Sequence, residues 1–286
     1  MPELPEVQTV VNHLARKLPG KVFLNCQVKV TKMVSQNFRE QILNFKVKTV
    51  KRRAKMIVIK SVKDKYLIIH LKMTGQLIYV DKKGEAVGGG HPIKSEDFDI
   101  TKPNKFTHII LNFKDASQLL FHDVRKFGWM KIVNSNQYSV ISNKHGIEPL
   151  SKDFTLNKFK EILKRRSNLK IKQLLLMQDL IVGLGNIYVD ESLFEAKIYP
   201  VRLAKTLKLD EIKRLHQSII KKLKQAIKLG GTSVNTFVSA SGERGKFVEK
   251  LKVYGRSGQK CFRCKSTLVK TKIGGRGTVY CKICQK

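Results

Sequence analysis

Apolar residues recur at three- and four-residue spacing near the start of the chain. They are Leu4, Val7, Val10, Val11 and Leu14. This spacing puts them on one face of an α-helix, so the pattern predicts an amphipathic helix that packs on a core. Pro5 suits the first turn, where its missing N–H would have no partner in any case. Pro19-Gly20 predicts the end of this helix.

The next region, as far as Val133, contains short segments rich in Val, Ile, Phe and Tyr. They are residues 22–34, 47–50, 56–59, 66–71, 77–80, 108–113, 119–121 and 129–133. Such runs predict β-strands, and the lack of helical patterns between them favours an antiparallel sandwich or barrel over a parallel α/β sheet. Residues 81–104 carry Gly88-Gly89-Gly90 and several charges, which predicts a long mobile excursion from a hairpin.

From Lys152 onward the apolar period becomes helical. The predicted helices cover residues 154–163, 171–177, 190–194 and 209–229. Gly230-Gly231 predicts a stop. A second, helical domain therefore begins after a polar connection near residues 134–143. Residues 232–250 are rich in Ser and Gly and are long enough to form a lid.

The size and charge of the chain limit its class. Its 286 residues predict one large or two modest domains, and its 42% apolar content is enough for ordinary cores. No apolar run is long enough to cross a membrane, and the start lacks the apolar segment of a signal peptide, so we expect a cytoplasmic protein. Lys and Arg number 57 against 22 Asp and Glu, a formal charge of +35. This excess favours nucleic acid as the partner, because lysine and arginine release counterions from phosphates; a lysine-rich proteome or ribosome association would also explain it.

The last part of the chain contains two CxxC pairs. Their cysteines are Cys261, Cys264, Cys281 and Cys284. Gly274-Gly275 and the β-prone residues 278–280 between the pairs predict a hairpin. Two such knuckles predict one structural zinc ion held by four thiolates, which leaves no coordination position open for catalysis; a redox pair is the alternative. Cys26 lies in a strand pattern and is predicted to be a small core residue.

The first six residues offer a second kind of chemistry. If Met1 is removed, Pro2 carries a free secondary amine, and a group of this kind is partly unprotonated at neutral pH and can attack carbon. Glu3 and Glu6 lie on the first helical turn, near the positive end of the helix dipole and beside this amine. A helix start with acidic residues and proline for purely structural reasons would have the same pattern.

A series of motifs then runs the length of the chain. They are Pro2-Glu3-Leu4-Pro5-Glu6, Arg53-Ala54-Lys55, His70-Leu71-Lys72-Met73-Thr74-Gly75, Arg125-Lys126-Phe127-Gly128, Gly183-Leu184-Gly185-Asn186-Ile187-Tyr188 and the cysteine segment. Together and in this order they resemble the bacterial formamidopyrimidine-DNA glycosylases, also called 8-oxoguanine DNA glycosylase/AP lyases. The series is much more specific than any one of its motifs, and it favours the chemical interpretation of the N-terminus.

The resemblance implies an α+β fold. Its parts are an N-terminal antiparallel β-sandwich flanked by helices, a helix-two-turn-helix domain and a C-terminal zinc-finger β-hairpin, with DNA in the cleft between the halves. The implied limits are 1–137 for the catalytic domain, 138–252 for the helical domain and 253–286 for the zinc finger. A lesion-capping loop is expected at residues 232–250.

The resemblance also implies roles for individual residues. Pro2 would form a Schiff base with C1′ of the damaged nucleoside, Glu3 would move protons at the sugar, and Glu6 would hold the network in place. Contacts to phosphates around the lesion are implied for four residues, of which Lys55 and Arg276 would also assist strand cutting. The four are Lys55, His70, Asn186 and Arg276.

Three side chains resemble a wedge that fills the gap left by the extruded base, namely Met73, Arg125 and Phe127. An enzyme that flips a base needs an apolar plug and a hydrogen-bond donor for the orphaned partner base. Further DNA contacts are implied for Arg166 and Lys172 on the helical surface and for Tyr254.

The implied function is a bifunctional DNA glycosylase/AP lyase of base excision repair. It would remove oxidised purines such as 8-oxoguanine and formamidopyrimidines from damaged double-stranded DNA, cut the strand by β,δ-elimination, contain one structural zinc ion and act as a monomer. Two alternatives remain: a glycosylase of the endonuclease VIII type for oxidised pyrimidines, and a zinc-finger DNA-binding protein without catalysis.

Overall fold

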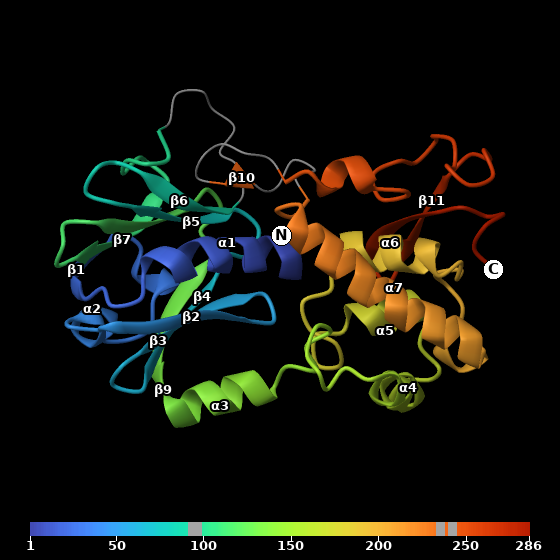
Figure 1. The fold of residues 1–286 in the computed structure, drawn as a ribbon, viewed down its shortest axis with the longest axis horizontal. Coiled ribbons are helices and arrows are strands. Elements are labelled where there is room, and N and C mark those ends of the chain that lie inside the picture. Colours follow the sequence, from blue (N-terminus) through green and yellow to red (C-terminus); the bar gives the residue numbers. More distant parts are fainter. Residues whose placement is uncertain (91–98, 233–237, 240–244) are drawn as a thin grey trace. The chain divides into compact units, whose positions relative to one another are not determined.

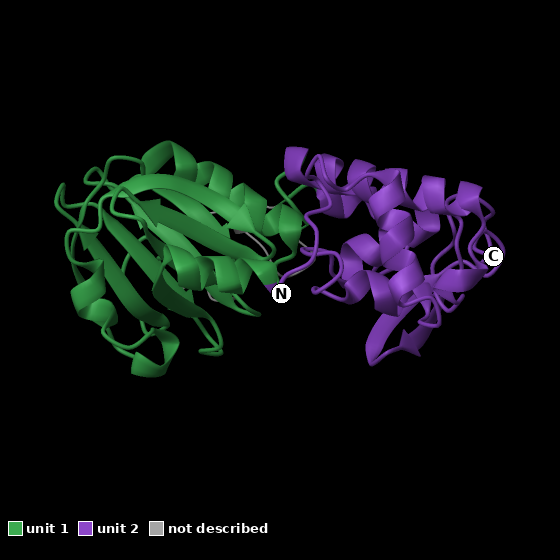
Figure 2. Cartoon of the chain, turned by 90° about the horizontal axis from the view of Figure 1, so that it is seen from below, with its two compact units in different colours: residues 1–143, 229–246 green, residues 144–228, 247–286 purple. Residues whose placement is uncertain are grey.

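The computed structural model describes residues 1–90, 99–232, 238–239 and 245–286. The chain forms two compact units, shown in different colours in Figure 2. Unit 1 comprises residues 1–143 and 229–246, and unit 2 comprises residues 144–228 and 247–286. The three domain limits inferred from the sequence stay a prediction.

Unit 1 is built on two antiparallel sheets (Figure 1). The first has the strand order β1-β7-β8-β5-β6-β10, with β1 at Phe23–Val28, β5 at Gly75–Val80, β6 at Ala86–Gly90, β7 at Thr107–Phe113, β8 at Gln118–Asp123 and β10 at Val238–Ser239. The second has the order β2-β3-β4-β9, with bounds Val47–Arg53, Met56–Ser61, Lys65–His70 and Trp129–Asn134. One apolar cluster contains buried side chains from both sheets, including Phe23, Ile59 and Phe121. The expected antiparallel β-sandwich is therefore confirmed.

Two helices pack along the sides of this sandwich. Helix α1 (Leu4–Lys17) packs against β6 of one sheet and β2 of the other. The short helix α2 (Phe38–Ile42) packs against β1 and β9, the outermost strands on the opposite side. Each helix thus covers one open side of the core. Helix α1 begins and ends close to the predicted limits because its apolar stripe faces that core.

Strand β6 corrects the expectation that the three glycines belong to a mobile excursion. Residues 86–90 instead pair with β5. A Cβ atom on Gly88 would lie 2.1 Å from the carbonyl oxygen of Leu77, and one on Gly90 would lie 2.3 Å from that of Gly75. The strand therefore requires glycine at a close approach of backbones. The rest of the excursion includes residues 91–98, which lie outside the described residues.

Three further differences concern short elements. The segment predicted as a strand over 22–34 is a strand only over Phe23–Val28, followed by a 3₁₀ turn at Thr31–Met33. Helix α2 was not predicted. The polar connection near 134–143 is helix α3 (Ser135–Asn143), whose Tyr138 stacks on Tyr66 of β4 at 4.4 Å between ring centroids.

Unit 2 is helical and ends in a β-hairpin. Its helices are α4 (Leu156–Arg165), α5 (Ile171–Leu176), α6 (Asn186–Glu195) and α7 (Leu209–Lys228), with 3₁₀ turns at Ala204–Thr206 and Phe247–Lys250. The hairpin consists of β11 (Val269–Ile273) and β12 (Arg276–Tyr280). Helix α6 is almost wholly buried because α5, α7 and β12 all pack on it. Within the described residues, no helix is both long and apolar enough to cross a membrane.

Candidate active site and zinc centre

The N-terminal end of α1 gathers the first group of predicted residues. Pro2 is buried, and the exposed fractions of Glu3 and Glu6 are 5% and 2%. The two acids form a capping box, in which each carboxylate accepts the backbone N–H of the other residue. Glu3 N lies 2.8 Å from Glu6 Oε2. These bonds satisfy free N–H groups of the first turn and fix both carboxylates beside the N-terminus.

Glu6 also connects the N-terminus to a distant segment. Its other oxygen, Oε1, accepts the backbone N–H of Thr232 at 2.8 Å. Gly231 precedes this contact with φ +85°, and a Cβ atom there would lie 3.0 Å from Glu6 Oε1. Thr232 pairs with Lys246, so Glu6 holds the root of the predicted lesion-capping loop. The loop's residues 233–237 and 240–244 lie outside the described residues.

Charged groups converge on the N-terminal amine, which belongs to Met1 in this structure. Burial lowers the pKa of this amine; Glu3 and Glu6 raise it, and Lys55 and Arg125 lower it, with a net lowering from the ordinary value. A buried environment therefore favours the neutral form of an amine at this point, which is the form that attacks carbon.

The β2–β3 hairpin brings Lys55 to this site. Lys55 is 7% exposed and follows Ala54, whose φ of 55° is unusual for a residue with a side chain. Arg52 supports the turn: its Nη1 donates to Ala54 O at 2.8 Å, and its Nε donates to Gln8 Oε1 on α1 at 3.0 Å. The turn and the start of α1 are thus fixed to each other. The sequence pattern gives no sign of this role for Arg52, although Arg52 precedes the Arg53-Ala54-Lys55 motif.

The predicted wedge residues lie on two loops of unit 1. The exposed fractions of Met73 and Phe127 are 39% and 54%, which is high for large apolar side chains. The Arg125 guanidinium lies over the Phe127 ring, 4.7 Å from its centroid. His70 ends β4 beside these loops, and its Nδ1 accepts the backbone N–H of Lys72 at 2.9 Å. Two exposed apolar side chains and a cation therefore lie on adjacent segments.

Lys172 does not lie on the helical surface, where the family resemblance predicts it. Its side chain is fully buried rather than on the helical surface. Its Nζ forms an ion pair with Asp190 Oδ1 at 2.6 Å and donates to Gly277 O at 3.1 Å. The expectation of a surface position is corrected, because Asp190 supplies a buried countercharge that the sequence pattern did not show. Lys172 joins α5, α6 and β12.

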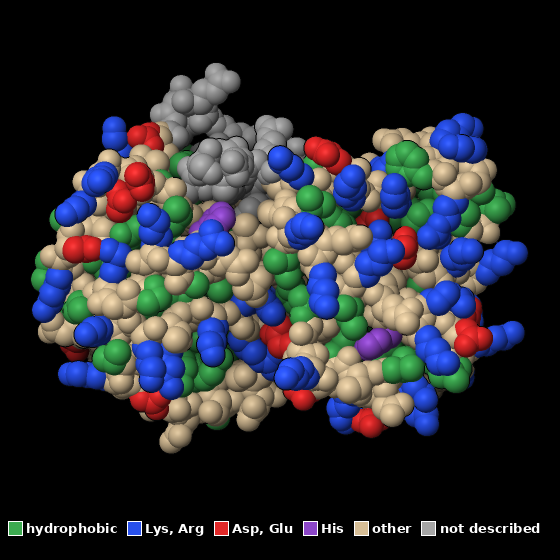
Figure 3. Space-filling model, in the orientation of Figure 1, with side chains coloured by type: hydrophobic (Ala, Val, Ile, Leu, Met, Phe, Trp, Pro, Cys, Tyr) green, Lys and Arg blue, Asp and Glu red, His purple; other side chains and the backbone are tan. Residues whose placement is uncertain are grey.

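The remaining predicted DNA contacts of unit 2 have different settings. Arg166, after α4, and Arg276, the first residue of β12, are exposed. Asn186 Nδ2 donates to Gly277 O at 2.8 Å, so this amide also supports the hairpin strand next to Arg276. Tyr254 is half-buried, and its backbone N–H donates to Glu191 Oε1 at 3.0 Å. Figure 3 shows many Lys and Arg side chains on the visible face of each unit.

The four cysteines of the CxxC pairs come together in unit 2. Their sulfur atoms lie within 4.8 Å of one another. The Sγ atoms of Cys261 and Cys284 are 3.9 Å apart, and those of Cys264 and Cys281 are 3.4 Å apart. A thiolate tetrahedron around zinc, with Zn–S bonds of about 2.3 Å, requires sulfur atoms about 3.8 Å apart, so this set fits the ion. The mini-core around it includes Phe194 of α6 and Val253.

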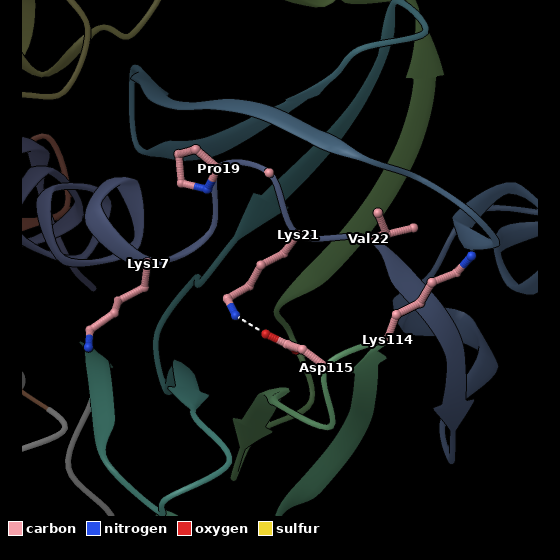
Figure 4. A pocket seen from close by; sticks show the side chains of 7 residues that line it. Lys17, Pro19, Lys21, Val22, Lys114 and Asp115 are labelled. Carbon is pink, nitrogen blue, oxygen red and sulfur yellow. Dashed lines mark hydrogen bonds and ion pairs between the residues drawn. The ribbon is translucent and has the colours of Figure 1, made fainter.

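A cavity of about 370 Å³ lies elsewhere on unit 1, at the C-terminal end of α1. Lys17, Lys21 and Lys114 line it, together with Asp115. Figure 4 shows Lys21 directed at Asp115, its ion-pair partner, and Lys17 pairs with Glu85 at 3.7 Å. None of the predicted site residues lines this cavity, and it lies at the opposite end of the helix from Glu3. It is therefore separate from the candidate active site.

Besides Asp190, two further buried acids have contacts that the sequence pattern does not show. Asp123 has no exposed surface and accepts bonds from both wedge loops. Glu191, also without exposed surface, accepts the backbone N–H groups of residues 252–254. The available signal was weak: both are acids in apolar surroundings in a chain where acids are outnumbered by bases.

Comparison with known proteins assigns all three parts of the chain. Residues 1–130 match the formamidopyrimidine-DNA glycosylase N-terminal domain, residues 145–238 match the formamidopyrimidine-DNA glycosylase H2TH domain, and residues 258–286 match the zinc finger found in FPG and IleRS. The formamidopyrimidine-DNA glycosylase of Halalkalibacterium halodurans is 39% identical over 294 residues, covering 100% of both chains.

Solved structures agree along the whole chain. A mutant of the Lactococcus lactis FPG, in complex with a Fapy-dG containing DNA, has a TM-score of 0.85 and 36% identity, covering 100% of both chains. The wild-type Lactococcus lactis Fpg in complex with an oxidized pyrimidine containing DNA has the same TM-score, 0.85, the same identity, 36%, and the same coverage, 100%.

Proposed function

Because the chain belongs to the formamidopyrimidine-DNA glycosylase family, it is a base-excision-repair glycosylase for oxidised purines, and we propose that its nucleophile is the amine of Pro2. This assignment applies to the chain after removal of Met1. The observation that supports it is the buried Pro2 between Met1, whose amine is influenced by Glu3, Glu6 and Lys55, and the two buried carboxylates of Glu3 and Glu6. The zinc finger supplies structure, since four thiolates complete the coordination of the ion.

In the proposed reaction the neutral amine attacks C1′ of the damaged nucleoside, and the bond from C1′ to the base breaks. The base leaves with the proton of the amine, the C1′–O4′ bond of the sugar ring then breaks as O4′ takes up a proton, and the ring-opened sugar remains attached to Pro2 as an iminium. Removal of a proton from C2′ then expels the 3′ phosphate, and a second elimination expels the 5′ phosphate. Glu3 would move protons at the sugar, and the fixed position of its carboxylate at the helix start supports this role.

Lys55 and Arg276 are proposed phosphate contacts that assist these eliminations. Lys55 stands beside the amine in unit 1, and Arg276 is exposed at the tip of the zinc hairpin in unit 2. His70, Asn186, Arg166 and Tyr254 are proposed as further contacts to DNA. Lys172 would support Arg276 indirectly, because it donates a hydrogen bond to the carbonyl oxygen of the next residue, Gly277.

The test is a covalent trap. Borohydride added during the reaction with duplex DNA that contains 8-oxoguanine opposite cytosine should reduce the iminium and leave the protein attached to DNA through Pro2. A matched protein that retains Met1 should give no adduct, since residue 2 then has an amide nitrogen. An adduct that maps to a lysine would contradict the role of Pro2, and strand cleavage without any adduct would contradict the Schiff-base route.

The same assay separates the alternatives. One relative was solved with an oxidized pyrimidine containing DNA, so a duplex with an oxidised pyrimidine is included as a second substrate. Faster turnover of that substrate would favour the endonuclease VIII type, and binding without cleavage of either would favour a non-catalytic protein. We also propose that the protein acts as a monomer in the cytoplasm, which sedimentation of the free protein and fractionation of cells would test.

A further inference from the structure

Asp123 is a buried acid at the end of β8 that the reaction described above does not use. Its exposed fraction is 0%. A buried carboxylate is costly unless hydrogen bonds replace its water. Its partners here are backbone N–H groups and one hydroxyl group, and they come from two different loops.

The first loop, residues 71–75, follows β4 and carries Met73. The Thr74 hydroxyl donates to Asp123 Oδ1. The second loop, residues 124–128, follows β8 and carries Arg125 and Phe127. The backbone N–H of Arg125 points at Asp123 Oδ1 and at Thr74 Oγ1, at 3.1 Å in both cases, and Gly128 N donates to Asp123 Oδ2 at 2.7 Å. One carboxylate therefore connects both loops.

The backbone of Asp123 is itself fixed in the first sheet. Its N–H donates to Phe106 O at 2.9 Å, and its carbonyl oxygen accepts from His108 Nε2 at 2.9 Å. It also pairs with Gly75 in the register of β5 and β8. The carboxylate is thus a rigid reference point for the loops around it.

Both loops have a backbone that needs such support. Lys72 and Lys126 adopt left-handed conformations, with φ of 51° and 57°, which are uncommon for residues with side chains. Gly128 is required for space, because a Cβ atom there would lie 2.5 Å from Phe121 Cζ and 3.1 Å from Asp123 Oδ2. The hydrogen bonds of Asp123 and the close packing at Gly128 hold the second loop in this shape.

We propose that Asp123, through Thr74, is a positioning residue that holds Met73, Arg125 and Phe127 in one fixed arrangement. This inference rests on the proposed function, in which these side chains enter the DNA as a wedge. Separate loops would have to be ordered at the moment of base extrusion, at a cost in conformational entropy; loops tied to one carboxylate are ordered beforehand. The contact between Thr74 and Asp123 makes the two loops one wedge.

The test compares excision of a paired base with cleavage of a preformed abasic site. Thr74→Val removes the hydroxyl and keeps the shape of the side chain, whereas Thr74→Ser keeps the hydroxyl. We expect Thr74→Val and Asp123→Asn to slow single-turnover release of 8-oxoguanine from a duplex by roughly tenfold or more, because extrusion needs the ordered wedge. Cleavage of the abasic site should stay within about threefold of wild type, and Thr74→Ser should restore excision.

The variant Phe127→Ala distinguishes the role of the wedge side chains from the positioning role of Asp123 and Thr74. If Phe127→Ala does not slow excision more than abasic-site cleavage, the wedge itself is wrong. If Phe127→Ala does so and Thr74→Val does not, only the positioning role of Asp123 and Thr74 is wrong. In the double variant, Thr74→Val should add little to Phe127→Ala, since both act through one wedge; fully multiplied effects would contradict the inference.

Equal losses on both substrates would also overturn the inference, because they would assign Asp123 and Thr74 to general folding or DNA binding. The near-isosteric Thr74→Val variant covers the case in which Asp123→Asn does not fold. A melting curve of each variant accompanies the kinetics.

Discussion

The loops of unit 1 that carry the proposed wedge and the zinc hairpin of unit 2 hold exposed side chains in two different ways. In unit 1 a buried carboxylate, Asp123, accepts N–H and O–H groups from both loops. In unit 2 the sulfur atoms of four cysteines, within 4.8 Å of one another, fit one zinc ion at the opposite end of the strand that begins with Arg276. The buried carboxylate and the metal site each order a segment that has little apolar core of its own.

The difference lies in how strongly each device restricts the sequence. Zinc of this kind needs a thiolate at all four positions, so the residue type is fixed wherever the ion binds. A carboxylate that accepts backbone N–H groups requires no particular side-chain chemistry in the residues that donate them, although packing makes glycine necessary at Gly128. The metal site can therefore be predicted from the CxxC spacing, whereas the role of the acid can be recognised only in the folded structure.

Unit 2 also uses buried acids. Glu191 accepts the backbone N–H groups of Lys252, Val253 and Tyr254, which ties the segment before the zinc finger to α6. Asp190 pairs with Lys172 and accepts Val279 N at 3.4 Å. The metal thus orders the open end of the hairpin, where the cysteine pairs precede β11 and follow β12. The buried charges fix the hairpin on the helices. Among its described residues, unit 1 uses buried acids of this kind but has no cysteine cluster for a metal.

The largest expected effect tests this division directly. Removal of zinc by a strong chelator, or Cys281→Ser, should unfold the hairpin, because zinc binding in such sites is worth about 10–16 kcal/mol of apparent folding free energy. DNA binding should fall as Arg276 loses its position. Trp129, the single tryptophan of the chain, lies on β9 in unit 1 and should keep its fluorescence and its unfolding transition.

Cys26→Ser is the matched control for zinc removal, since Cys26 lies on β1, outside the cluster. Metal analysis and hydrogen exchange of residues 269–280 follow the result. Fully active protein without zinc, or a shift of the Trp129 transition as large as the loss in unit 2, would contradict the contrast between the two units.

The next effect concerns acid. Burial lowers the pKa of His122 to about 4, and its ring lies between Thr107 and Ile100 O in unit 1. The unfolded chain has the ordinary value of 6.5, so between pH 6.5 and 4 it binds a proton that the folded chain does not, and stability falls as the pH falls through this window. At pH 5 the loss should be about 2 kcal/mol relative to neutral pH.

Urea unfolding followed by Trp129 fluorescence at pH 7.5 and pH 5.0 measures this loss in unit 1. His122→Gln, which cannot titrate here, should flatten the dependence. If wild type and His122→Gln lose the same stability, the acid sensitivity of unit 1 belongs to other groups.

The smallest effect compares one proposed phosphate contact from each unit. Lys55→Ala and Arg276→Ala should each lower the slope of log binding constant against log salt by about 0.9, the value for one lost phosphate contact on duplex DNA. Lys55 is buried and Arg276 is exposed, so only Lys55→Ala should also lower the stability of its unit. Lys63→Ala, an exposed lysine in the β3–β4 turn, is the control, and an unchanged slope in either test variant would remove that residue from the contacts.

The sequence by itself determined the elements that depend on local pattern. The limits of α1, α5 and α7 follow apolar spacing and stop signals, because a helix buries its face wherever it packs. The zinc site and the family motifs were also visible, since their chemistry fixes residue types at fixed positions. The helix start alone predicts Glu3 beside Pro2, whereas Lys55 is expected there only from the family resemblance.

Tertiary structure decided the features whose partners are distant along the chain. Gly88 and Gly90 indicated a loop until the close approach of β5 made glycine necessary in a strand. By sequence, Lys172 resembles the many surface lysines. In the structure its ammonium group is buried and is paired with Asp190 and the carbonyl oxygen of Gly277. Asp123 is one acid among many charged residues until Thr74 and Gly128 come within hydrogen-bonding distance. In each case the stabilising free energy comes from a contact between residues far apart in the sequence. The local sequence around either residue has no periodicity that predicts this contact.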